Sequence, residues 1–330
     1  MDNLYFLLQQ MLYFAIPLLI VALGGMFSER SGIVNIALEG IMLFGAFFGL
    51  LMVKYIQDMQ GREVIENIAK QQLVLLVGLL VASLAGGLFA LLHAYASINM
   101  KANQVISGTA LNLFAPALSI FIARSIPFTN YTQQVNFRGK AFLIKKVPIL
   151  GDIPFIGKIL FQQAFITTFI GFLILVLSYI IIYKTRFGLR LRACGEHPQG
   201  AASAGVSVMK MRYLGVLISG ILAGCGGYVF IVTTSTQYNA TVSGYGFLAL
   251  AVLIFGEWKP LRIFLASLFF GLMKTIASAY SGIPFLASLR LPSEFYRMIP
   301  FIATLIVLSL SSSKGEGPRA LGEIYDAGKR

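Results

Sequence analysis

Long apolar runs, separated by short polar or glycine-rich connections, dominate the hydrophobic pattern of this chain. A helix needs about 20 mostly apolar residues to cross a bilayer. By this length the pattern predicts eight clear membrane spans, at roughly residues 4–26, 33–53, 73–97, 104–123, 163–183, 213–235, 261–281 and 295–313. A further apolar run at 245–256 is short enough to be re-entrant or half-helical. We therefore expect an all-α polytopic membrane protein with about nine transmembrane helices, built as a single transmembrane domain over residues 1–330.

The composition fits a chain that is surrounded by lipid. Apolar residues make up 57% of the chain and charged residues only 12%, whereas charged residues average about 25% in soluble domains. Residues 1–27 lack the basic start and the small-residue cleavage site of a secretory signal, so we expect them to stay as the first span. The net charge of +13 comes from Lys and Arg residues between the apolar runs, which favours contact with anionic membrane lipids over nucleic-acid binding.

The basic residues of the connections predict which of them share a side of the membrane. Connection 184–212 is rich in Lys and Arg and holds a single acid, Glu196, so the positive-inside rule places it in the cytoplasm. The insert 124–162 should form an external subdomain despite its several basic residues, because long connections obey the rule weakly. Counting spans from 184–212 also places in the cytoplasm the connections 27–32, 98–103 and 257–260 and the tail 314–330.

No sequence motif points to catalysis, a metal or a cofactor. The chain contains no GxxxxGK[ST] phosphate loop, no HExxH and no GxSxG. Cys194 and Cys225 lie far from each other and from any His or Cys cluster, so we expect no disulfide and no metal site. His93 is alone in an apolar run and His197 lies in a charged connection, so we interpret them as a packing and a surface residue. We expect no catalytic residue, and any ATP hydrolysis would take place on a different chain.

Polar residues within the predicted spans are the candidates for helix-packing ties or for the lining of a pathway. On helices, Asn35 and Glu39 would share one face, and Gln104 and Asn112 would share another. Lipid cannot satisfy such groups, so they should face the bundle interior or a water-filled cavity. Glu39 could line or gate a cavity, or it could tie its helix by hydrogen bonds to Asn35 or to a backbone donor. We favour the tie, because Glu39 lies near the cytoplasmic entry of its predicted span. Lys274, within another predicted span, could snorkel to the surface or pair with an acid.

The sequence "GEHPQGAASAG" at 195–205 predicts a short helix within the connection 184–212. Pro198 suits the first turn of a helix, Ala201 and Ala202 favour its continuation, and Gly205 suits its end. A short helix with small side chains, held between two spans, could dock into a groove on a partner protein. The alternative is an inert connector, although connectors are usually shorter.

Three stretches carry a family resemblance: "SGIVNIALEGIMLFGAF", "TRFGLRLRACGEHPQGAASAGVSV" and "LISGILAGCGGYVF". Over about residues 10–310 the chain resembles the permease subunits of bacterial ABC importers of the branched-chain amino acid, ribose and nucleoside group, especially the nucleoside and simple-sugar branch. The resemblance implies the ABC importer permease fold, a multi-pass location in the bacterial plasma (inner) membrane, and half of the translocation pathway for a nucleoside or a simple sugar. It also implies three kinds of partner: a second permease in a heterodimer, ATP-binding subunits and an external solute-binding lipoprotein.

In that family a cytoplasmic coupling helix inserts into the ATPase. The residues of this chain that match the coupling segment are Gly195, Glu196, His197, Pro198, Ala201, Ala202 and Gly205. The alternative function is an ion-coupled secondary transporter that works without an ATPase. Such a carrier needs an intramembrane acid that binds the ion, and Glu39 is the candidate for that role.

Overall fold

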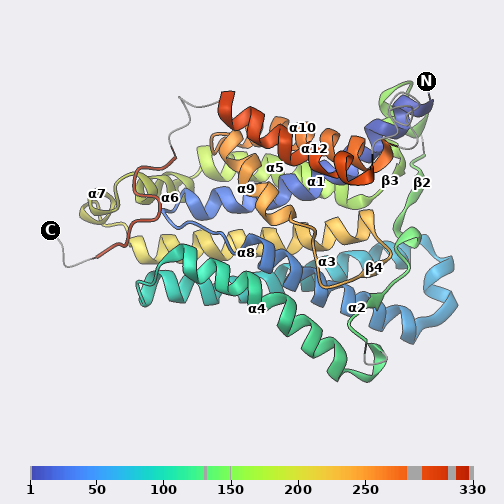
Figure 1. Ribbon diagram of the computed structural model, residues 1–330, viewed down its shortest axis with the longest axis horizontal. Coiled ribbons are helices and arrows are strands. Elements are labelled where there is room, and N and C mark those ends of the chain that lie inside the picture. The colour runs from blue at the N-terminus through green and yellow to red at the C-terminus, as the bar shows by residue number, and fades with distance from the viewer. Residues whose placement is uncertain (1, 130–131, 149, 281–291, 311–316, 327–330) are drawn as a thin grey trace.

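The computed structural model describes residues 2–129, 132–148, 150–280, 292–310 and 317–326. These residues form a bundle of helices along the long axis of the molecule, with short strands at one end (Figure 1). A π-helical turn, Tyr95–Asn99, extends the third helix. The helices are α1 Asp2–Glu29, α2 Leu38–Glu66, α3 Ile68–Ala94, α4 Gln104–Ser125, α5 Ile166–Lys184, α6 Arg186–Glu196, α7 Pro198–Ser203, α8 Val208–Thr234, α9 Tyr245–Phe255, α10 Pro260–Ala279 and α12 Ser293–Leu310.

Seven of the described helices are long and apolar enough to cross a membrane, namely α1, α2, α3, α4, α5, α8 and α10. The predicted all-α membrane fold is confirmed, but the count of about nine spans is slightly too high for the described residues. The run at 245–256 is α9, an apolar helix of 11 residues, which is too short to cross a bilayer alone. The predicted span 295–313 overlaps α12, which is not among the seven, and its end at 311–313 lies outside the described residues.

α8 lies at the centre of the bundle, with 78% of its apolar stretch buried. Small residues let the neighbouring helices approach until their backbones are in contact. A Cβ atom added to Gly86 of α3 would lie 2.5 Å from the carbonyl oxygen of Gly220 on α8. One added to Gly45 of α2 would lie 2.8 Å from the carbonyl oxygen of Ala82 on α3. Membrane helices gain van der Waals contact from such packing. Here the packing fixes the distances between the helices that carry the polar candidate residues.

One end of the bundle, named here the α7 end, joins connections that are far apart in the sequence. Nη1 of Arg30 lies 3.6 Å from Oε1 of Glu196, and Nη2 of Arg30 donates to the carbonyl oxygen of Trp258 at 3.2 Å. At the same end Lys101 forms an ion pair with Asp326, with 3.3 Å between Nζ and Oδ1. The structure thus brings together the connections that the charge pattern assigned to one side of the membrane.

The opposite end, named here the strand end, holds the insert 124–162. Strand β1 (Val135–Asn136) pairs antiparallel with β4 (Gln237–Tyr238), which lies between α8 and α9. Strand β2 (Ile144–Lys146) pairs antiparallel with β3 (Gln162–Ala164). The first pair ties the insert to a connection about 100 residues later in the chain, and the second closes the insert on itself.

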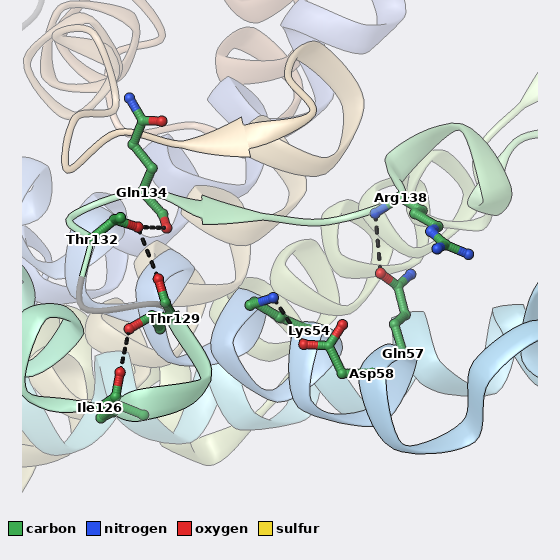
Figure 2. A network of polar contacts seen from close by, with 8 residues as sticks. All are labelled: Lys54, Gln57, Asp58, Ile126, Thr129, Thr132, Gln134 and Arg138. Carbon is green, nitrogen blue, oxygen red and sulfur yellow. Dashed lines mark hydrogen bonds and ion pairs between the residues drawn. The ribbon is translucent and has the colours of Figure 1, made fainter.

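Polar contacts attach the start of the insert to the bundle (Figure 2). Oε1 of Gln57 on α2 accepts the backbone N–H of Arg138 at 3.0 Å. The hydroxyl of Thr132 donates to the carbonyl oxygen of Thr129 at 2.9 Å and closes the turn after α4. The insert is therefore a small subdomain packed on the strand end, and its external location stays a prediction.

Candidate functional site

Residues 30–37, named here the break, separate α1 from α2 and are not helical. The predicted start of the second span at residue 33 is wrong, because α2 begins only at Leu38. Ile33, Asn35 and Ala37 of the break are buried. Buried backbone that is not helical needs other partners for its N–H and C=O groups. Polar side chains of α3 and α4 supply such partners.

Val34 in the break is held from both sides. Its N–H donates to Oε1 of Gln104 at the start of α4 (2.7 Å), and its carbonyl oxygen lies 2.9 Å from Nε2 of His93 on α3. A carbonyl oxygen can only accept, so Nε2 carries a hydrogen and, in the neutral ring, Nδ1 accepts from the hydroxyl of Ser107 (3.1 Å). His93, interpreted from the sequence as a packing residue, is therefore a buried hydrogen-bonding support of the break.

Asn112 of α4 links the break to the first turn of α2. Its Oδ1 accepts the N–H of Gly40 at 2.8 Å, and its Nδ2 donates to the carbonyl oxygen of Ile36 at 2.9 Å. One side-chain amide thereby satisfies an unpaired donor of the helix start and an acceptor of the break. Gln104 and Asn112 both contact this segment from α4, which agrees with the prediction that they share a face.

Asn35 lies in the break and not on α2, so the expectation that it shares a helix face with Glu39 is wrong. Its Nδ2 donates to the hydroxyl of Ser219 on α8 at 2.9 Å, and the residue is completely buried. The backbone on both sides of Asn35 is held by other helices, so this bond adds α8 to the set of supports. Ser219 was not among the predicted residues, because it lies in a small-residue stretch that is typical of helix packing.

The carboxylate of Glu39 joins α2 to the start of α9. Oε1 accepts the N–H of Gly244 at 2.8 Å, and Oε2 accepts the N–H of Gly246 at 2.6 Å. Gly244 has a φ of +77°, and a Cβ atom on Gly246 would overlap the backbone of Glu39, so both positions require glycine. A carboxylate at a helix N-terminus satisfies free N–H groups and interacts favourably with the helix dipole. This geometry is that of a tie to backbone donors, and it leads to α9 and not to Asn35.

Lys274 of α10 also reaches the start of α9. Its Nζ lies 5.5 Å from the centroid of the Tyr245 ring, within the range of a cation–π interaction. Tyr245 is the first residue of α9 and is buried. Contact with an aromatic ring was not among the roles predicted for Lys274. Two helices, α2 and α10, therefore hold the start of α9 through charged side chains.

An apolar groove of about 530 Å³ opens between α2, α3 and α4. The rings of Phe44, Phe48, Phe89 and Phe114 line it, together with aliphatic side chains of α3 and α4. The polar candidate residues are absent from its lining. A site for a polar solute needs some convergent hydrogen-bonding groups, so this groove suits lipid chains or an apolar protein surface.

The predicted short helix of the coupling segment is confirmed as α7, and a helix that was not predicted, α6, holds Gly195 and Glu196. α6 ends at Glu196 and α7 begins at Pro198, which occupies the first helical position as predicted. His197 lies between them, and its Nδ1 accepts the N–H of Gly200 at 3.0 Å. This bond caps α7 at its N-terminus with an imidazole in the place of the usual Ser, Thr, Asn or Asp.

Gly205 ends α7, which confirms the predicted stop. It has a φ of +78°, a conformation that favours glycine. The N–H of Gly205 donates to the carbonyl oxygen of Ala202 (2.9 Å), and the N–H of Val206 donates to that of Ala201 (3.0 Å). This pair of bonds is the Schellman motif. α7 is therefore capped at both ends, and Figure 1 shows that it projects at the α7 end of the bundle.

The seven predicted coupling residues differ in exposure. Glu196, His197 and Gly205 are exposed, Ala202 is half-buried, and Gly195, Pro198 and Ala201 are buried. The buried Ala201 packs α7 onto the bundle through Cys194 of α6 and Val208 of α8. The residues of α7 that are exposed were not among the seven, namely Gln199, Gly200 and Ser203. A helix of six residues is too short for its exposed face to be read from periodicity.

Residues 7–308 match a protein-family model described as branched-chain amino acid transport system / permease component. The guanosine ABC transporter permease protein NupQ of Bacillus subtilis (strain 168) is 40% identical over 97% of this chain and 96% of its own length. The nucleoside ABC transporter permease protein NupC of Lactococcus lactis subsp. cremoris (strain MG1363) is 39% identical over 98% of each chain. The glucose ABC transporter permease protein TsgB13 of Haloferax volcanii is 25% identical over 93% of this chain and 76% of its own length.

The solved structures contain no match to this chain. The matched residues include the break, its supporting side chains and α7. The predicted importer-permease family and the multi-pass location in the inner membrane are confirmed. The chain therefore belongs to the family of branched-chain amino acid transport system permease components, which are membrane subunits of ABC transporters.

Proposed function

We propose that this chain forms half of the translocation pathway of an ATP-driven importer and couples it to a separate ATPase subunit that binds over α7. The observation that carries the proposal is α7 itself, a helix capped at both ends that projects between α6 and α8 (Figure 1). A rigid projecting helix suits a groove on a partner protein. ATP hydrolysis takes place on that partner, so this chain needs no catalytic residue.

A nucleoside is the substrate that the relatives favour. NupQ is named for guanosine and NupC for nucleosides, at 40% and 39% identity, whereas TsgB13 is named for glucose at 25% identity. A simple sugar is therefore the second choice. The further partners are a second permease subunit, which completes the pathway as a heterodimer, and a solute-binding lipoprotein, which meets the strand end from outside the cell.

The coupling follows from how α7 is attached to the spans. α6 starts two residues after the end of α5 at Lys184, and α8 starts at Val208, shortly after α7. Displacement of α7 by the ATPase therefore moves the ends of two spans. α8 carries this movement to the break through the bond between Ser219 and Asn35. Rocking of these elements opens the pathway alternately to the lipoprotein and to the cytoplasm.

Co-purification with the ATPase subunit tests the docking on α7. We expect Ser203→Trp to lose the ATPase, because the large side chain separates the exposed face of α7 from its groove. Leu189→Trp is the matched control on α6, where Leu189 is 62% exposed, and it should keep the ATPase. Retention of the ATPase by Ser203→Trp, with transport at the wild-type rate, would contradict the proposal.

The second candidate function is an ion-coupled secondary transporter with Glu39 as its ion-binding acid. Both oxygens of this carboxylate accept backbone N–H groups, which favours a supporting role. Uptake into proteoliposomes, with ATP enclosed inside and tritiated guanosine in the external buffer, distinguishes the two functions. The importer takes up guanosine only with ATP and its partner subunits, whereas a secondary carrier takes it up alone under a proton or sodium gradient.

A further inference from the structure

The C-terminal residues 317–326, named here the strap, cross the α7 end without forming a helix or a strand. Figure 1 shows this segment beside α6 and α7. The N–H of Ala320 donates to the carbonyl oxygen of Gly195 on α6 (2.9 Å), and the N–H of Gly322 donates to that of Gly32 in the break (3.0 Å). The strap therefore connects the end of α6 to the start of the break through backbone hydrogen bonds.

The strap also covers Arg212, near the start of α8. Arg212 is 2% exposed, and its Nη1 donates to the carbonyl oxygen of Glu323 at 2.8 Å. Its guanidinium lies 5.9 Å from the centroid of the Tyr325 ring. Nε and Nη2 of Arg212 are buried without a hydrogen-bond partner among the described residues. Burial of an incompletely paired cation is costly. When the strap lifts, water reaches Arg212 and relieves this cost. The relief offsets part of the free energy needed to break the hydrogen bonds of the strap.

Tyr325 packs the strap against the apolar cluster at which α6, α7 and α8 meet. This small cluster is formed by Cys194 of α6, Ala201 of α7 and Val208 of α8. The next residue, Asp326, forms the ion pair with Lys101 in the connection between α3 and α4. The strap thus contacts α8, the break, the α3–α4 connection and the cluster at which α6, α7 and α8 meet.

We propose that the strap is a positioning element for transport that carries the movement of α7 to the break. The inference rests on the proposed docking of an ATPase on α7. The path leads from the cluster that contains Ala201 to Tyr325, and along the strap to the bond between Gly322 and Gly32. From the break it continues into α3, α4 and α8 through their polar side chains.

The ion pair between α6 and the break is a weaker route for the same movement. The atoms of Arg30 and Glu196 are 3.6 Å apart, and the side chain of Glu196 is 45% exposed. Exposed ion pairs contribute little because water and salt screen them. Two backbone hydrogen bonds and the packing of the half-buried Tyr325 make the strap the stronger connection.

Gly322→Val tests this role. Gly322 has a φ of +81°, which a β-branched residue rarely adopts, and a Cβ atom there meets only Val34 at 3.5 Å. The substitution therefore strains the strap without a clash against the bundle. Ile324→Ala, at a position that is 52% exposed in the same strap, is the matched control. Each variant is reconstituted with the ATPase, the second permease and the lipoprotein, and the uptake of tritiated guanosine per ATP hydrolysed is measured.

We expect Gly322→Val to keep the ATPase subunit bound and to hydrolyse ATP, while guanosine uptake per ATP falls about fivefold or more, as expected for a lost coupling between sites. Ile324→Ala should keep the wild-type ratio. Maleimide labelling reports independently on the strap. Burial raises the pKa of the Cys194 thiol, so its labelling should be slow in the wild type and faster in Gly322→Val. Cys225, which is buried within α8, serves as the internal reference.

Faster labelling of Cys194 with an unchanged uptake per ATP would overturn the inference, because the strap would then only cover the bundle. Loss of the ATPase from Gly322→Val would also overturn it, since the strap would then be part of the docking surface. If Gly322→Val leaves the labelling of Cys194 unchanged, a variant truncated after residue 316 removes the strap completely. Its labelling and its guanosine uptake per ATP are then compared with those of the wild type. Failure of the wild-type chain to bind the ATPase refutes the proposed function itself, and the inference with it.

Discussion

Replacement of Asn112 by leucine tests whether polar side chains hold the break in place. Asn112→Leu keeps a side chain of similar size but removes the Oδ1 acceptor and the Nδ2 donor. The N–H of Gly40 and the carbonyl oxygen of Ile36 then lose the partners that lie 2.8 and 2.9 Å away. The substitution therefore removes two hydrogen bonds without a large change in volume.

The expected loss of stability follows from those two bonds. Hydrogen bonds between membrane helices contribute about 0.6 kcal/mol on average and up to about 1.7 kcal/mol. Two such bonds give a decrease of about 1–3 kcal/mol in the free energy of unfolding. The upper half of this range applies where Gly40 and Ile36 find no replacement partner in the variant.

Reversible unfolding of the purified protein by a denaturing detergent, followed by circular dichroism, measures this decrease. Thr109→Val is the matched control on the same helix. Thr109 is exposed, and its hydroxyl donates only to the carbonyl oxygens of Val105 and Ile106 in its own helix (3.0 Å each), so its loss should cost less than about 0.5 kcal/mol. An Asn112→Leu protein as stable as the control would refute the supporting role of this side chain.

Three further substitutions test other contacts in the same unfolding assay. Glu39→Gln keeps one acceptor at the start of α9 but loses the charge, so we expect a decrease of about 1–2 kcal/mol, and unchanged stability would show that α9 does not need the cap. Gly224→Leu places a side chain against the carbonyl oxygen of Ala82 and should cost about 1–3 kcal/mol; wild-type stability would contradict the close packing of α3 and α8. Asp326→Lys should cost less than about 1 kcal/mol, because both partners of its ion pair are nearly half exposed, and a larger loss would make this pair an anchor of the strap.

The spans could be predicted because lipid imposes a minimum length on any apolar helix that crosses it. The fourth span was expected at 104–123 and is found at Gln104–Ser125. The short run at 245–256 was expected to be re-entrant or half-helical, and the structure shows a helix of 11 residues there, α9. Asn103 accepts hydrogen bonds from the N–H groups of Val105 and Ile106 at the start of α4, so local capping agrees with the apolar pattern there. The length of an apolar run and its capping residues are thus sufficient to predict a membrane-spanning helix.

The break could not be predicted from the apolar pattern. Its central residues, "IVNIA" at 33–37, are as apolar as the helix that follows, and hydropathy does not distinguish a helical turn from buried extended chain. The side chains that support the break lie on three other helices, so their role can be recognised only when the fold brings them together. His93 is the clearest case, because a single histidine in an apolar run gives no sign of the carbonyl oxygen that it contacts at 2.9 Å.

The cap on α9 also has a consequence for how the protein is made. The two N–H partners of Glu39 follow it by 205 and 207 residues in the chain. At a synthesis rate of about 5–20 residues per second, roughly 10–40 s separate the emergence of α2 from that of α9. A charged residue in a membrane span costs up to about 2.5–3.5 kcal/mol on translocon-insertion scales, a value that applies to the helix centre, and Glu39 lies in the first turn of α2. The nascent N-terminal half therefore enters the membrane with an acid whose final donors have not been translated, and complete burial of α2 has to wait for the last third of the chain.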